Sequence, residues 1–187
     1  RRMEPYVYLI LASIIGFFVM LAIRENPFEE MEPRHAAHLA SVYNIPMDHA
    51  GNLLNGKGLN PQLVNYWFVI HPPCLYLGMV IFSVPFAFGM AALITGELGS
   101  YWVRVTRRWT MAAWLFLTCG IILGGLWAYR QLGWGGYWAW DPVENASFLP
   151  WCAATAFLHS IMIQERRDML KRWNVFLLIF AFFLTIE

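Results

Sequence analysis

Runs of uncharged apolar residues, each close to the length of a bilayer-spanning helix, most limit what this chain can fold into. A helix needs about 20 apolar residues to cross the hydrocarbon. Five runs meet or approach that length: Tyr6–Ile23, Pro72–Ile94, Trp109–Tyr129, Pro142–Ile163 and Trp173–Ile186. Charged residues make up only 13% of the chain, against about 25% in soluble domains. The sequence therefore predicts an all-α fold, a polytopic membrane helix bundle.

The last run is too short to cross a membrane unaided, and the chain begins with arginine rather than methionine. We therefore expect a single membrane domain, residues 1–187, that is part of a larger bundle of which this chain supplies about five transmembrane helices. The net charge of +1 gives no global field that would attract nucleic acid.

The placement of basic residues predicts an orientation. Arginines and lysines gather before the first run and within the connections 96–108 and 164–172. Short cytoplasmic segments are enriched in such residues. The alternation places segment 24–71, with one short helix near residues 35–43, and the tryptophan-rich loop 130–141 on the outer side of the membrane.

Local patterns mark where helices begin, bend and meet. The sequence Asp141-Pro142-Val143-Glu144 predicts an N-cap, a proline at the first helical position and a carboxylate in the first turn. Pro85 and Pro150 fall inside runs and should kink them. Gly120 and Gly124 form a GxxxG pair, a pattern typical of close helix approach.

His159 is the histidine whose position is most informative. It lies 17 residues beyond Pro142, about 26 Å along an ideal helix and thus within the hydrocarbon. Polar groups at that depth usually face the protein interior, and the small residues 153–156 would leave room for a flat ligand. From position alone, a heme ligand and an imidazole hydrogen-bonded to a neighbouring helix are equally good interpretations.

The other histidines lie in or near the outward segment. His71 precedes Pro72, which places it at the outer mouth of the second span, where an interfacial histidine without a ligand is the more common case. His35, His38 and His49 are expected to be solvated, with a spare heme ligand as the less common alternative. The three cysteines form no CxxC pair and no disulfide framework.

The outer loop is unusually rich in aromatic residues. Residues 134–151 read WGGYWAWDPVENASFLPW, and the loop itself carries Trp134, Tyr137, Trp138 and Trp140. An aromatic belt at the membrane interface explains such residues in general but not this density, broken by glycines. Aromatic faces stack on a large planar ligand. Asp141 has a sufficient role as a helix cap, and no catalytic residue is assigned.

This loop, with IHPPCLYLGM before it and FLHS after it, closely resembles the heme-handling family that carries the tryptophan-rich WWD loop. Its WDPVENASF form is similar to the CcmF-type heme lyases of cytochrome c maturation. The resemblance covers the chain from about residue 58 onward, with three separated motifs in the same order. Tyr137 stands where the family usually has tryptophan, and a tyrosine should still stack there.

The resemblance implies two heme sites. His71, with Trp134, Tyr137, Trp138, Trp140 and Asp141 near it, would bind the iron of a heme that arrives as substrate at the outer face. His159 would ligate the iron of a heme b embedded in the membrane. Family members use a second histidine from later in the chain at each site. No histidine follows His159, so a continuation of the chain or a separate polypeptide would supply the second ligands.

The resemblance also implies a function, partners and a location. Heme would come from a CcmE-type heme chaperone, and its vinyl groups would receive the thiols of an apocytochrome c presented by a thioredoxin-like or CcmH-type partner. The location would be the bacterial inner membrane, with the loop in the periplasm. A WWD-family heme exporter without ligation chemistry remains the alternative, as does a purely structural membrane subunit.

Overall fold

Every regular element in the described part of the chain is helical, which confirms the predicted fold class. The computed structural model describes residues 2–25, 33–47, 49, 53 and 60–186. The helices are α1 (Glu4–Glu25), α2 (Pro33–Tyr43), the 3-10 turn η1 (Pro61–Leu63), α3 (Tyr66–Ile81), α4 (Ser83–Thr95), α5 (Ser100–Gln131), α6 (Pro142–Arg167) and α7 (Lys171–Phe183).

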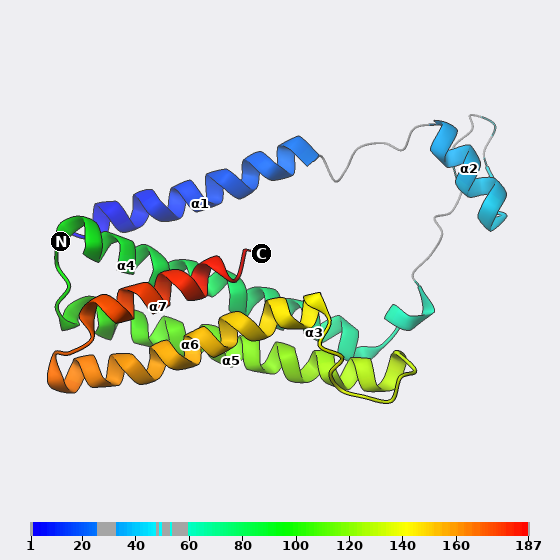
Figure 1. The fold of residues 1–187 in the computed structure, drawn as a ribbon. Helices are drawn as coiled ribbons and strands as arrows, with labels where there is room; N and C mark the ends of the chain where they lie inside the picture. The colour runs from blue at the N-terminus through cyan, green and yellow to red at the C-terminus, as the bar shows by residue number, and fades with distance from the viewer. Residues whose placement is uncertain (1, 26–32, 48, 50–52, 54–59, 187) are drawn as a thin grey trace. The chain divides into compact units, whose positions relative to one another are not determined.

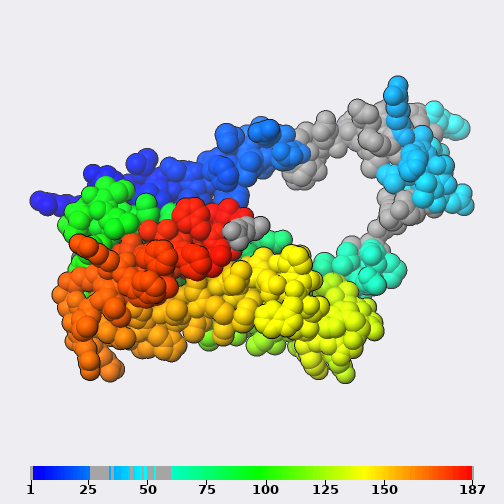
Figure 2. All heavy atoms as spheres, viewed as in Figure 1, coloured from blue at the N-terminus to red at the C-terminus, as the bar shows by residue number. Residues whose placement is uncertain are grey.

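The chain divides into two compact units. Residues 1–16 and 65–187 form the first, and residues 17–64, with the expected short helix α2, form the second. Within the first unit, α3 lies along α5, and α6 packs on both α5 and α7 (Figure 1). The space-filling view shows α6 and α7 side by side (Figure 2).

Four stretches of the described chain are long and apolar enough to cross a membrane: α1, α3 with α4, α5 and α6. Four of the five predicted spans are thus confirmed, and the chain is a multi-pass membrane protein. α7, of 13 residues, is shorter than a span, as its sequence indicated.

The predicted start of α5 was wrong, whereas the predicted bend at Pro85 was confirmed. α5 begins at Ser100 rather than near Trp109, so the arginines expected in a connecting loop lie in its first turns. The second span is two helices that meet at Phe82. Pro85 explains the break, because it has no N–H to donate to the carbonyl of Ile81. α6, in contrast, runs through Pro150 without interruption.

Stacked aromatic pairs in the core of the first unit join α5 to α6 and α4 to α7. Trp102 of α5 stacks on Phe157 of α6, with ring centroids 6.4 Å apart, and Phe86 of α4 stacks on Phe182 of α7 at 4.1 Å. A buried polar contact joins α6 and α7, since Asn174 donates to the Gln164 side chain at 2.6 Å. These contacts fix α5 and α6, which carry most of the candidate site.

Candidate functional site

His71 lies inside α3, not at its start. The helix begins at Tyr66, and the Asn65 side chain caps it by accepting a hydrogen bond from the Trp67 amide at 2.9 Å. The prolines at positions 72 and 73 are therefore in the second turn. The expectation that Pro72 opens the helix was wrong, because Asn65 supplies a better start signal and transmembrane helices tolerate internal prolines.

The His71 ring is held between α3 and α5. Its Nδ1 lies 2.7 Å from the carbonyl oxygen of Gly120, and a carbonyl can only accept, so Nδ1 carries the proton. A methyl group at Gly124 would lie 2.7 Å from the ring, and one at Gly120 would lie 2.8 Å from the Leu75 backbone. The GxxxG pair thus permits the close helix approach that the sequence predicted, and Nε2 keeps a free lone pair.

The structure brings His71 and the outer loop to one cavity. The cavity, of about 100 Å³, is lined on one side by His71 and Gly124 and on the other by Trp138, Asp141 and Glu144. Residues far apart in the sequence therefore meet where a ligand could contact both. Its volume is well below the roughly 300–1,000 Å³ of small-molecule pockets, so a molecule as large as a porphyrin would lie mostly outside it.

The loop is held by the start of α6. Asp141 is the N-cap and accepts from the Glu144 amide at 2.7 Å, as predicted. The Glu144 carboxylate turns back and accepts from the Ala139 amide at 2.7 Å. Asn145 donates to the Trp140 carbonyl at 3.1 Å, next to a Trp140 backbone in the left-handed region with φ 58°. Both carboxylates thus shape the backbone of the loop, which agrees with a capping role.

The loop's four aromatic side chains differ in their contacts and in their exposure to solvent. Trp138 alone of the four lines the cavity, and its ring meets Phe148 edge-on at 5.7 Å. Tyr137 stacks on Tyr129 of α5 at 4.4 Å. Trp134 and Trp140 are 44% and 68% exposed. The aromatic faces outside the cavity are therefore available for contact with a flat ligand or a partner.

His159 is exposed, whereas its depth had suggested that it would face the protein interior. Its Nδ1 donates to the Thr155 carbonyl of the preceding turn at 2.8 Å. The ring borders a cavity of about 320 Å³. Of the small residues 153–156, Ala153 and Ala154 are buried elsewhere. Thr155 does line the space beside His159, together with the larger residues Met111, Trp114, Leu115 and Leu158.

A reciprocal pair of tryptophan–threonine hydrogen bonds joins α5 to α6 beside this cavity. Trp114 donates to the Thr155 hydroxyl and Trp151 donates to the Thr118 hydroxyl, both at 2.8 Å. The two indoles stack with centroids 5.8 Å apart. Sequence reasoning missed this arrangement, although the signal was present: WxxxT occurs at Trp114 in α5 and at Trp151 in α6. The pair fixes the wall that faces His159.

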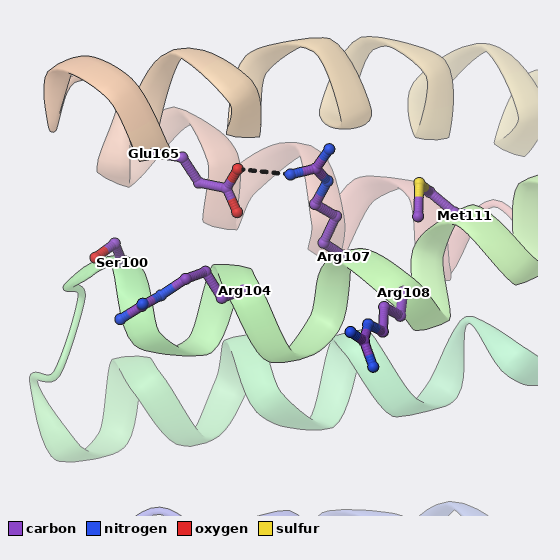
Figure 3. A pocket seen from close by; sticks show the side chains of 6 residues that line it. All are labelled: Ser100, Arg104, Arg107, Arg108, Met111 and Glu165. Carbon is purple, nitrogen blue, oxygen red and sulfur yellow. Dashed lines mark hydrogen bonds and ion pairs between the residues drawn. The ribbon is translucent and has the colours of Figure 1, made fainter.

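A third cavity of about 500 Å³ lies near the other end of the α5–α6 pair. Figure 3 shows Arg104, Arg107 and Arg108 of α5 around it, with Arg107 directed toward Glu165 of α6. That ion pair is 2.9 Å long. Sequence analysis had assigned these arginines only to membrane orientation.

The remaining histidines and the cysteines add no ligand cluster. His38 and His49 are exposed in the second unit, and the side chain of His35 lies outside the described residues. Cys74, Cys119 and Cys152 are free thiols. Among the described residues, no three His, Cys, Asp or Glu side chains gather as a metal-binding group. His71 and His159 can therefore each offer one metal ligand, through Nε2.

The chain matches the family model described as cytochrome C assembly protein over residues 4–186. It belongs to the cytochrome c assembly protein family. The cytochrome c-type biogenesis protein CcmF of Haemophilus influenzae is 48% identical over 172 residues, which are 92% of this chain and 24% of that protein. CcmF of Escherichia coli is 46% identical, with the same coverage of both chains.

A solved structure and a further relative agree with this assignment. The structure titled cytochrome c heme lyase CcmF has a TM-score of 0.62 and 50% identity, and covers 66% of this chain and 21% of its own. Protein ccl1 of Rhodobacter capsulatus is 45% identical over 97% of this chain and 25% of its own length. This chain thus spans about a quarter of the length of the curated relatives it matches.

Proposed function

We propose that this chain is the heme-handling part of a cytochrome c heme lyase. It binds heme at the outer face of the membrane and promotes its covalent attachment to apocytochrome c. The observation that carries the proposal is the His71 ring, which donates Nδ1–H to Gly120 and borders the same cavity as Trp138 of the WWD loop. Histidines that bind a metal through one ring nitrogen usually donate the N–H of the other to a carbonyl or carboxylate.

The residues of the outer site would each make a different contact with heme. His71 supplies one axial nitrogen for the iron. Trp138 forms the wall of the cavity, while the exposed faces of Trp134, Tyr137 and Trp140 offer stacking area for the part of the macrocycle outside it. Asp141 keeps the loop backbone in place through its cap. The heme vinyl groups would then be open to the thiols of the apocytochrome.

His159 fits a second axial role, toward a heme b in the membrane. Its Nδ1 is engaged by the Thr155 carbonyl, which leaves Nε2 free toward a cavity lined by apolar and aromatic side chains. A heme b there would supply electron-transfer chemistry that keeps the incoming iron reduced. The second axial ligand of each iron would come from outside this chain. A heme exporter without ligation chemistry would not need this second histidine at membrane depth.

Orientation and partners complete the proposal. The arginine-rich ends of α5 and α6 would face the cytoplasm of a bacterial cell, and the loop 132–141 would face the periplasm. A CcmE-type chaperone would deliver heme to the exposed loop, and a thioredoxin-like or CcmH-type partner would present the apocytochrome. No feature of the charge distribution calls for nucleic acid.

The test compares His71→Gly with Trp138→Ala in the protein as the cell makes it. His71→Gly leaves a hole of imidazole size, so added imidazole should partly restore outer heme binding and cytochrome c maturation. Trp138→Ala removes stacking area, and imidazole should not restore it. His49→Gly, at an exposed histidine of the second unit, is the matched control. Normal maturation in His71→Gly without imidazole would refute the proposal.

A further inference from the structure

The arginine cavity carries an excess of positive charge. Three arginines and one glutamate line it, so its formal charge is 3 − 1 = +2. Arg107 pairs with Glu165. Arg104 and Arg108 make no hydrogen bond or ion pair with any residue that the structure describes. Two guanidinium groups therefore remain to bind an anionic ligand, and guanidinium groups match carboxylates in a bidentate fashion.

This cavity adjoins the cavity of His159. Met111 lines both, and the arginines lie one and two turns before it on α5. On α6, His159 and Glu165 are six residues apart, about 9 Å of helix rise. A flat ligand whose metal is bound at His159 and whose carboxylates are at its rim would span this interval. The ring system would occupy one cavity and the carboxylates the other.

The two ends of the His159 cavity differ in polarity. Toward the outer face, the wall includes Trp114, which stacks on Trp151 behind it, and both indole N–H groups are already bonded to threonines. A carboxylate placed there would lose water without gaining a partner, which is costly at membrane depth. Toward the arginines, the same carboxylate would meet charge-assisted donors.

We propose that Arg104 and Arg108 bind the two propionate carboxylates of the heme b whose iron His159 ligates. The inference rests on the proposed function, because it requires a heme at His159. It adds the orientation of that heme, with the propionates toward the arginine-rich end of α5 and the vinyl edge toward Trp114. The excess charge of +2 matches the two carboxylates.

The experiment measures binding of heme and of heme dimethyl ester, in which both carboxylates are masked. The protein is stripped of heme in detergent and titrated by Soret absorbance in the His71→Gly background, so that only the membrane site is observed. The protein with its wild-type arginines should bind heme with an affinity about tenfold or more above its affinity for the diester. Arg108→Gln, which leaves the Arg107–Glu165 pair intact, should move that ratio toward one without weakening the diester.

Arg167→Gln is the matched control, since it removes the same charge from an exposed position near the same end of α6. The control should keep the preference for heme. Equal affinity of the unsubstituted protein for both ligands would overturn the proposal, and this arm needs no substitution in the arginine cavity. Two results for Arg108→Gln would also overturn it. One is an equal loss of affinity for heme and for the diester. The other is an unchanged ratio of the two affinities together with loss of copurifying anionic lipid.

A different variant tests the proposed function independently of the heme orientation. His159→Gly in the same background should abolish the Soret complex with both ligands. If that complex persists, His159 holds no heme and the function proposed for it is wrong. If the complex is lost but the arginine variants keep the wild-type ratio, only the orientation of the heme is wrong.

Discussion

Gly124→Ala should damage the outer site while leaving the fold nearly intact. A Cβ at this position would lie 2.7 Å from Cε1 and 2.9 Å from Nδ1 of His71, where ordinary contacts begin at 3.4 Å. The ring must therefore retreat by about 3.4 − 2.7 = 0.7 Å. A retreat of that size directed away from Gly120 would stretch the 2.7 Å bond from Nδ1 to its carbonyl to about 3.4 Å, beyond hydrogen-bond range.

The substitution affects the site more than the fold because the atoms that must move belong to the His71 side chain. Overpacking costs about 1–3 kcal/mol, and the lost hydrogen bond is worth about 1 kcal/mol. We expect outer heme affinity to fall by about fivefold or more, while the thermal midpoint falls by only several degrees. Heme titration with the membrane heme as internal standard measures the first, and a thermal scan measures the second.

Two comparisons make the result decisive. Gly16→Ala is the matched control, because a Cβ there meets nothing within 4 Å. In the His71→Gly background the added methyl group meets no ring, so Gly124→Ala should have no further effect on heme binding. Additive losses in that double variant would refute the reasoning, and so would wild-type outer heme affinity in Gly124→Ala alone.

His159→Ala should remove the membrane heme b while the protein still inserts, and an unchanged reduced pyridine-hemochrome spectrum would show that the residue is not a ligand. Asp141→Ala should cost about 1 kcal/mol through the lost cap and speed hydrogen exchange at the Glu144 amide; equal exchange rates would count against the cap. Cysteine at position 99 should resist an impermeant thiol reagent in intact cells lacking the native cysteines, and cysteine at 135 should react, whereas the reverse pattern would contradict the orientation.

Features that depend on local chemistry were predictable from the sequence. The Asp141 cap, the close approach at Gly120 and Gly124, and the positions of four spans follow from side-chain type, backbone sterics and apolar length. The start of α3 was mistaken because two signals competed, and Asn65 prevailed over the prolines. The start of α5 was mistaken because charged residues in a helix that extends beyond the bilayer resemble a loop when only hydropathy is considered.

The sequence indicated part of the grouping of the candidate residues but not their arrangement. Sequence placed His71 and the loop on one face, and the structure brings His71, Trp138 and Asp141 to one cavity. Which aromatic side chain enters the cavity depends on tertiary contacts such as the stacking of Tyr137 on Tyr129. Periodicity carries no information about such pairs.

The two candidate ligands share one chemical state but reach it by different routes. Both donate Nδ1–H to a main-chain carbonyl, which leaves Nε2 for a metal. The acceptor of His159 is Thr155, one turn away on the same helix, so that nitrogen is set as soon as α6 forms. The acceptor of His71 is Gly120 on another helix, so its nitrogen is set only once α3 and α5 have packed. The orientation of the His71 ring therefore depends on bundle assembly, whereas the orientation of the His159 ring is already set within α6.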